Sequence, residues 1–224
     1  MIWHLLLKNC TIYLFADDTK LYIRVLRNQV SQFLLDDLHA VFNWCKVWQL
    51  SLALSKCAIL PIRGIRSDSV KPKYVINGTE LETVEHARDL GDYVSGNLKP
   101  AYHISQIVRP AHRIECQIHR AFVSTDHSFQ MQMFNTYVRP RLEYCSVIWN
   151  PYLKRDIWSL EKVQRRQTKR MAGLWNVQYE DRLIQLEQIS LQKRRLCIDL
   201  IMLFNIVHGL CAIKFETMFK YTLY

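Results

Sequence analysis

Two adjacent carboxylates, Asp17 and Asp18, are the residues of this 224-residue chain best suited to chemistry. They lie between two β-prone apolar runs, Thr11–Phe15 and Leu21–Leu26, so the pattern predicts a hairpin with both aspartates at its tip. Carboxylate oxygens are ligands that Mg²⁺ prefers, and in two-metal nucleotidyl transfer they hold cations that clamp the attacking and leaving oxygens. The alternative is an ordinary surface turn, where aspartate is common.

Two other groups of polar residues have a simpler structural explanation. Asp36 and Asp37 lie in a helical pattern whose apolar residues occupy the other face, and we expect both side chains to be solvated. His112, Cys116 and His119 recur at i, i+4 and i+7, which places three possible zinc ligands on one helix face. Zinc needs a fourth ligand, and no paired Cys or His motif lies nearby, so partly buried helix residues are the better interpretation.

A cluster of five cations within nine residues is the second candidate site. It covers about half the circumference of a helix that the apolar spacing predicts over 153–173. Lysine and arginine bind phosphates without reading sequence, which favours a nucleic-acid partner. The alternative is a solvated charged face. The five residues are Lys162, Arg165, Arg166, Lys169 and Arg170.

Charge is concentrated in the second half of the chain. Residues 1–99 hold 12 basic and 10 acidic side chains, whereas residues 100–224 hold 18 and 10, for a net charge of +10. A basic half beside a nearly neutral half favours a polyanion, nucleic acid before membrane, over other partners. A basic surface without any partner remains the alternative.

The spacing of apolar residues predicts a small β-containing unit followed by a helical one. An amphipathic helix is expected over about 28–50, a strand over Lys56–Ile62, a hairpin around Asn77-Gly78 and another strand over Arg88–Val94. From Tyr102 onward every pattern is helical. The expected fold class is therefore α+β. The expected helices cover about 102–123, 127–145, 153–173, 179–188 and 190–208.

Cysteine usage and hydropathy indicate an intracellular protein, nuclear or cytoplasmic. The seven cysteines are scattered and contain no Cys-x-x-Cys pair, which is typical of reduced thiols. No segment has the pattern of a signal peptide or of a membrane span; the most apolar stretch, Leu196–Ile213, is interrupted by polar residues.

The residues around the two aspartates form a recognisable motif. Phe15-Ala16-Asp17-Asp18 closely resembles the apolar-Ala-Asp-Asp motif of reverse transcriptases from non-LTR (LINE-type) retrotransposons. Downstream, Trp48–Cys57 resembles the family's palm segment with its lysine. Asp89-Leu90-Gly91 resembles the primer-grip Leu-Gly, and His103-Ile104 resembles the His-Ile at the start of the thumb.

Segments resembling the family's thumb continue in the expected order. The resemblance covers roughly residues 11–210, and its strength lies in the combined order and spacing of its pieces. The thumb-like segments are Tyr137–Tyr144, Val147–Pro151, Leu160–Arg166, Tyr179–Leu183 and Arg194-Arg195 with Asp199-Leu200.

The resemblance implies a role for each matching residue. Asp17 would ligate catalytic Mg²⁺, and Asp18 would support the same site. Lys56 would be the general acid that protonates the pyrophosphate leaving group; the alternative is an ordinary exposed lysine. Leu90 and Gly91 would let the backbone approach the primer end, because glycine has no Cβ, unless they form a simple strand kink. The five-cation cluster would lie along an RNA template paired with a DNA primer, and dNTPs would be the substrates.

The departures from the family pattern concern the catalytic centre. The family takes a third metal-binding aspartate from an earlier strand, but the 16 residues before Asp17 contain no Asp or Glu. Ala53 stands where the family usually has Asn. Asp92 stands where an apolar residue usually follows Leu-Gly, and we expect it to repel primer phosphate.

Together these features predict a partial polymerase palm over 1–98, with short antiparallel strands and one helix, and a helical thumb with a C-terminal extension over 99–224. The expected function is that of a fragment of an RNA-directed DNA polymerase, a nucleotidyltransferase, which is inactive alone because the first catalytic Asp and the fingers are missing. The alternative is a non-catalytic nucleic-acid-binding remnant or a non-functional pseudogene product.

Overall fold

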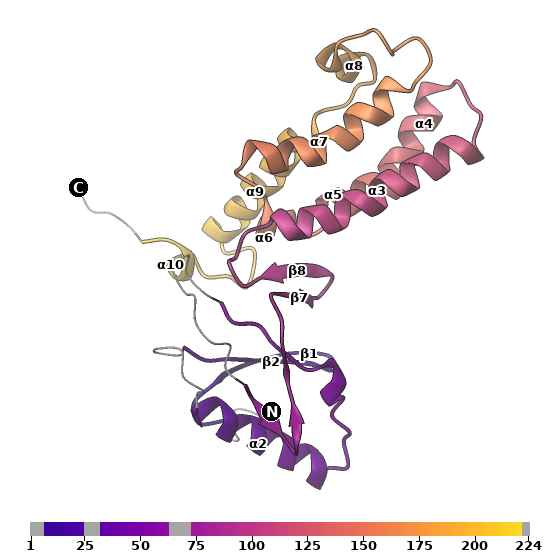
Figure 1. Ribbon diagram of the computed structural model, residues 1–224. Coiled ribbons are helices and arrows are strands. Elements are labelled where there is room, and N and C mark those ends of the chain that lie inside the picture. Colours follow the sequence, from indigo (N-terminus) through magenta and orange to yellow (C-terminus); the bar gives the residue numbers. More distant parts are fainter. Residues whose placement is uncertain (1–6, 25–31, 63–72, 221–224) are drawn as a thin grey trace. The chain divides into compact units, whose positions relative to one another are not determined.

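Strands lie in the N-terminal part of the chain and helices dominate the C-terminal part (Figure 1). The computed structural model describes residues 7–24, 32–62 and 73–220. Within these ranges the last strand ends at Ser95 and the regular structure from Ala101 onward is helical, which confirms the predicted α+β class. The chain divides into two compact units, one of residues 1–87 and 95–98 and one of residues 88–94 and 99–224.

The predicted hairpin around the two aspartates is present in the first unit. Strand β1 (Thr11–Phe15) pairs antiparallel with β2 (Asp18–Tyr22), and Phe15 lies opposite Asp18. The connection is therefore only two residues long, shorter than the predicted loop over 16–20. Ala16 takes a positive φ of 51°, which lets the chain reverse within this short loop.

The helix and the Asn-Gly hairpin of the first unit also agree with prediction. Helix α2 covers Gln32–Val47; the rest of its predicted N-terminal end lies outside the described residues. Strands β4 (Val75–Ile76) and β5 (Thr79–Glu80) flank Asn77 and Gly78, whose φ angles of 47° and 77° are both positive. Positive φ at both central positions is the property for which Asn-Gly is favoured in such turns. The core of this unit contains Leu34, Tyr74, Ile76 and Leu81.

The strand expected over Lys56–Ile62 is much shorter, and its pairing differs from the prediction. A 3₁₀ turn, η1 (Leu54–Lys56), comes first, and β3 (Ala58–Ile59) follows. Strand β3 pairs with β6 (Glu82–Thr83) in parallel, so the expectation of only antiparallel strands is wrong here. Two-residue pairings between distant segments leave no pattern of alternation in the sequence to detect.

Asp37 is buried, which contradicts the expectation that it is solvated. The residue is 2% exposed, and its carboxylate accepts backbone N–H groups from Lys8, Asn9 and Cys10 at 3.1, 2.9 and 2.7 Å. The neighbouring Asp36 is exposed, as expected, and accepts from Gln32. Asp37 therefore attaches helix α2 to the segment that leads into the hairpin of Asp17 and Asp18.

A second hairpin replaces the single strand predicted over Arg88–Val94. Strand β7 (His86–Asp89) and strand β8 (Asp92–Ser95) are neighbours in one sheet, connected by Leu90 and Gly91. Residues 88–94 of this hairpin pack with the second unit, although the predicted boundary after residue 98 assigns them to the first.

The second unit contains the predicted helices, with one interruption. The region expected as a single helix over 127–145 is divided by a π-helical segment, η2, that ends just before Arg139-Pro140. Proline has no N–H to continue the hydrogen-bond ladder, which accounts for the change of pitch. The elements are α3 (Ala101–Ala121), α4 (His127–Met133), η2 (Phe134–Val138), α5 (Arg139–Glu143), α6 (Ser146–Trp149), α7 (Lys154–Lys169), α8 (Tyr179–Gln185), α9 (Leu191–Val207) and α10 (Phe215–Met218).

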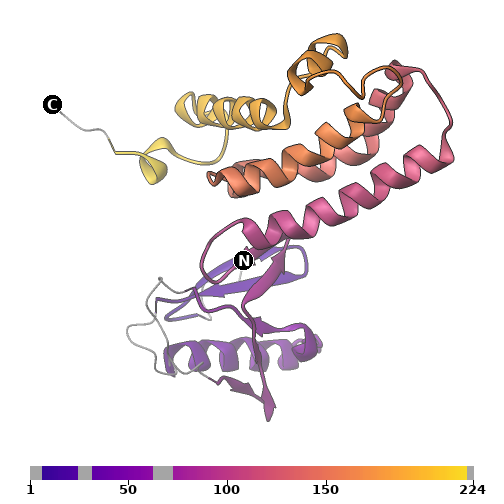
Figure 2. The ribbon, with the colours of Figure 1, turned by 45° about the horizontal axis from the view of Figure 1, so that its top comes forward.

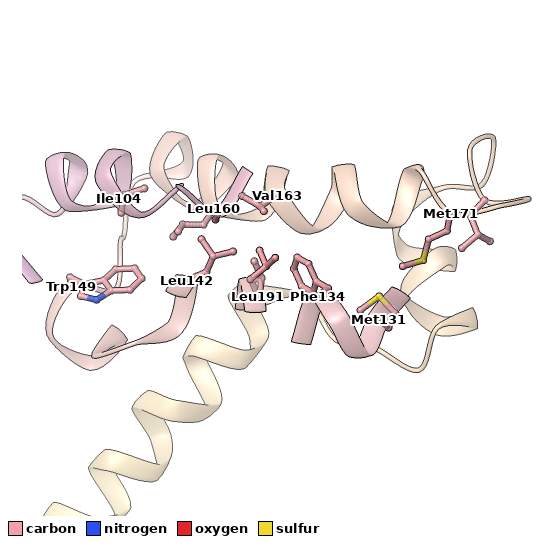
Figure 3. Close-up of a cluster of buried hydrophobic side chains, with 12 residues drawn as sticks. Ile104, Met131, Phe134, Leu142, Trp149, Leu160, Val163, Met171 and Leu191 are labelled. Atoms are coloured by element: carbon pink, nitrogen blue, oxygen red, sulfur yellow. The ribbon is translucent and has the colours of Figure 1, made fainter. Parts of the chain in front are cut away.

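Helices α3 and α7 run side by side in this unit (Figure 2). Apolar side chains from α3, the η2 region, α7 and the start of α9 meet in one core; Phe134, Leu160 and Leu191 are at most 1% exposed (Figure 3). No helix in the described part of the chain is long and apolar enough to cross a membrane.

Candidate functional site

The predicted catalytic residues lie on the surface of the first unit. Asp17 occupies the two-residue loop between β1 and β2, Asp18 begins β2, and both side chains are exposed. Lys56 is exposed at the end of the 3₁₀ turn η1. In the described ranges there is no group of three or more His, Cys, Asp or Glu residues that could hold a metal ion.

The primer-grip-like residues form the tip of the β7–β8 hairpin. Leu90 and Gly91 have φ angles of 47° and 98°, so this two-residue loop needs left-handed backbone at both positions. Tyr144 packs on the tip: its hydroxyl donates to the Leu90 carbonyl at 3.0 Å. A Cβ added at Gly91 would lie 3.2 Å from Cε1 of Tyr144, so glycine provides both the φ angle and the space.

His103 holds the same hairpin from the start of α3. Its Nδ1 accepts the Tyr93 backbone N–H at 3.1 Å, and its ring lies against Trp149 with centroids 4.8 Å apart. Burial lowers the pKa of His103. The Leu-Gly, His-Ile and Tyr144 segments, separate in the sequence, thus meet at one place in the second unit.

Asp92, the residue that follows Leu-Gly, is buried beside His103. It is 8% exposed, with Oδ1 at 3.8 Å from Nε2 of His103, so its side chain is directed into the protein rather than toward solvent. Burial raises the pKa of Asp92, and the neighbouring Asp89 raises it further. The expected repulsion of a primer phosphate by Asp92 therefore stays a prediction, for a side chain that lies within the protein.

Two cations of the five-cation cluster, which covers the C-terminal part of α7 and its C-cap Arg170, bind a buried carboxylate. Glu115 of α3 is fully buried; Arg170 Nη1 lies 3.1 Å from its Oε1, and Arg166 Nε lies 3.5 Å from its Oε2. The two arginine side chains remain 40% and 39% exposed. These ion pairs attach α7 to α3 and fix the direction of both guanidinium groups.

The other three members of the cluster differ in their surroundings. Arg165 stacks over the Tyr179 ring at 3.9 Å from its centroid and pairs with Glu180 at 3.2 Å. Lys162 and Lys169 are exposed, and neither forms an ion pair with any residue in the described ranges. They lie seven residues apart, which places them on one stripe of the helix, about 10 Å from each other along its axis.

Three exposed arginines of α3 are further cations of the second unit that the sequence pattern did not single out. Arg109, Arg113 and Arg120 are all exposed, and their spacing of four and seven residues places them along one stripe of the helix. Arg120 lies around one pocket with Arg166 of α7 and with Arg170, which directly follows α7. The i, i+4, i+11 spacing of these arginines in the sequence could have predicted a stripe of cations on one helix face. It is less conspicuous than five cations within nine residues.

The His112, Cys116 and His119 group contributes to helix packing. All three residues are half-buried, as expected. His112 Nδ1 lies 3.4 Å from Glu115, His119 Nε2 lies 3.0 Å from Oε1 of Gln167 on α7, and Arg166 donates to the Cys116 sulfur at 3.2 Å.

Comparisons with known proteins identify one relative but no family. The chain is 34% identical over 125 residues to an uncharacterized protein of Caenorhabditis elegans. That alignment covers 54% of this chain and 63% of the relative, so the chain spans less than two thirds of the length of the protein it matches. No family model matches the chain, and no solved structure matches it.

Proposed function

We propose that the chain is a palm-and-thumb segment of an RNA-directed DNA polymerase of the non-LTR retrotransposon type and that, alone, it binds a template–primer duplex without extending it. The observation that carries this proposal is the exposure of cations on α7 and α3: Lys162 and Lys169 lie on one stripe of α7, and Arg109, Arg113 and Arg120 lie on one stripe of α3. The order of the motifs along the chain supports the polymerase origin. Tyr144 and His103 contact the Leu-Gly hairpin, which supports a common role for these three segments.

A non-catalytic role is favoured over polymerisation by the surroundings of the two aspartates. Asp17 and Asp18 are exposed at a hairpin tip, and the described residues provide no third metal-binding carboxylate near them. Two-metal transfer requires fixed positions for both cations, which two adjacent aspartates do not supply. A complete centre with Mg²⁺ would need a further donor from outside the described residues.

The duplex-binding surface is tested by the salt dependence of binding. Each phosphate neutralised contributes about 0.9 to the slope of log K against log salt for B-DNA, so Lys162→Ala with Lys169→Ala should flatten the slope by about two. The loss should be similar on every sequence, because phosphate contacts do not read bases. Fluorescence anisotropy of labelled duplexes across a salt series gives both quantities.

The matched control removes two exposed lysines elsewhere in the same unit. Lys154→Ala with Lys193→Ala changes the net charge equally but leaves the cluster intact, and we expect a slope close to that of the wild type. Equal slopes for wild type and the Lys162/Lys169 variant would show that the cluster is a solvated face. A loss restricted to one duplex sequence would indicate base readout and would also contradict the proposal.

Primer extension is expected to be undetectable for residues 1–224 with either Mg²⁺ or Mn²⁺. The reason is the missing third carboxylate, since the cations cannot be held at fixed positions. The measurement is template-dependent incorporation of a labelled dNTP, compared between the wild type and Asp17→Asn. Incorporation that is present in the wild type and disappears in Asp17→Asn would show that Asp17 belongs to a working centre.

A further inference from the structure

An open pocket of about 340 Å³ lies where α3 meets the C-terminal part of α7. It is lined by Cys116, His119 and Arg120 of α3 and by Arg166 and Arg170 at the other side. Three of its five lining residues are arginines, and an open pocket with this lining suits an anionic ligand.

The arginines of this pocket are oriented before any ligand arrives. The fully buried Glu115 binds Arg166 and Arg170 from beneath at 3.5 and 3.1 Å, and both arginines also contact the Cys116 sulfur, at 3.2 and 3.9 Å. Each guanidinium has five N–H donors in a fixed plane, and in the described ranges these contacts use only a part of them. The two arginine side chains have therefore already lost conformational entropy in the folded protein, so less entropy is lost when a ligand binds.

The charge of the pocket selects among possible anions. Three arginines less one buried carboxylate leave two positive charges, with His119 not counted. A phosphate monoester carries about −1.5 to −2 at pH 7 and offers three acceptor oxygens, whereas an internal phosphodiester of a nucleic acid carries one charge. A carboxylate has one charge and two oxygens and would leave more of the arginine donors unused.

We propose that this pocket binds a phosphate monoester dianion, from either the 5′-phosphorylated end of a nucleic-acid strand or a free phosphate ligand. Arg120, Arg166 and Arg170 donate to the phosphate oxygens, and Glu115 positions the last two. The pocket goes beyond the proposed duplex-binding function, because free phosphate would occupy it whether or not a duplex lies along α7.

Cys116 lines the pocket and therefore reports its occupancy. We expect inorganic phosphate to slow the alkylation of Cys116 by uncharged iodoacetamide in a saturable way, at constant ionic strength kept with chloride. The exposed Cys197 of α9 lies outside the pocket lining and serves as the internal reference, whose alkylation should not change. The two rates are measured on the full chain by mass spectrometry of the alkylated peptides.

Arg120→Gln is the decisive variant, because Arg120 is exposed and takes no part in the ion pairs with Glu115. Loss of one charge-assisted donor should raise the phosphate concentration for half-protection about tenfold. Arg113→Gln is the control, because Arg113 lies seven residues before Arg120 on α3 and outside the pocket lining. It makes the same charge change and should raise the phosphate concentration for half-protection by less than about twofold.

The source of the phosphate is distinguished by two duplexes that differ only in a 5′-phosphate. Stronger protection of Cys116 by the phosphorylated duplex supports a strand end as the ligand, and protection by inorganic phosphate alone supports a free ligand. Absence of saturable protection, or equal effects of Arg120→Gln and Arg113→Gln, would overturn the proposal. If phosphate does not protect Cys116 but the wild-type protein still binds duplex with the expected salt slope, then the pocket proposal fails and the duplex-binding proposal stands.

Discussion

Replacing Glu161 by alanine should lower the free energy of unfolding of the second unit by about 3–5 kcal/mol. Glu161 of α7 is 6% exposed, and its carboxylate accepts the Tyr179 hydroxyl and the backbone N–H groups of Leu191 and Gln192, the latter two at 3.2 and 3.1 Å. The first N–H groups of a helix have no partners within it. Glu161 thus supplies from α7 the acceptor that the start of α9 needs, and its negative charge also favours this helix end.

Two control variants separate this role from a general effect of charge. Glu161→Gln keeps one acceptor oxygen and should cost about half as much, whereas Glu180→Ala removes a carboxylate that is 71% exposed and should cost less than about 1 kcal/mol. Denaturant unfolding followed by far-ultraviolet circular dichroism gives the free energies, and hydrogen exchange shows whether the start of α9 loses protection. A cost for Glu161→Ala similar to that of Glu180→Ala would show that α9 does not depend on this carboxylate.

Local patterns predicted the elements well because local physics determines them. The apolar spacing in α3 and α7 follows one helix face, and Asn77-Gly78 has the backbone preference that its turn requires. The pairing of β3 with β6 was not predictable in the same way. It joins two short segments in parallel, and nothing in a two-residue strand specifies its partner.

The candidate site was predicted in its residue types but not in its contacts. The basic character of α7 is visible in the sequence, but the ion pairs of Arg166 and Arg170 with Glu115 connect residues more than 50 positions apart. Asp37 shows the same limit, because its partners precede it by 27 to 29 residues. A carboxylate on the polar side of a helical pattern is predicted to be solvated unless the segment that covers it is known.

The last prediction concerns this buried carboxylate. Asp37→Ala should destabilise the first unit by about 3–4 kcal/mol at neutral pH, because the N–H groups of Lys8, Asn9 and Cys10 would lose their shared acceptor. The neighbouring Asp36→Ala is a closely matched control; its side chain is exposed, and we expect a change below about 0.5 kcal/mol. Hydrogen exchange of the three amides, corrected for intrinsic rates, measures the effect directly.

Acid titration gives the same contact an independent signature. Burial alone would raise the pKa of Asp37, but the hydrogen bonds from Lys8, Asn9 and Cys10 outweigh it and hold this pKa below the ordinary 3.8. A carboxylate with a lowered pKa in the folded state adds its full stabilisation above its unfolded pKa and loses it as the pH falls through the folded value. The wild-type amides of residues 8–10 should therefore lose protection below pH 3.8, whereas Asp37→Asn should show weaker protection that does not change over this range. Identical acid profiles for wild type and Asp37→Asn would mean that the charge of Asp37 does not hold α2 to the segment that leads into β1.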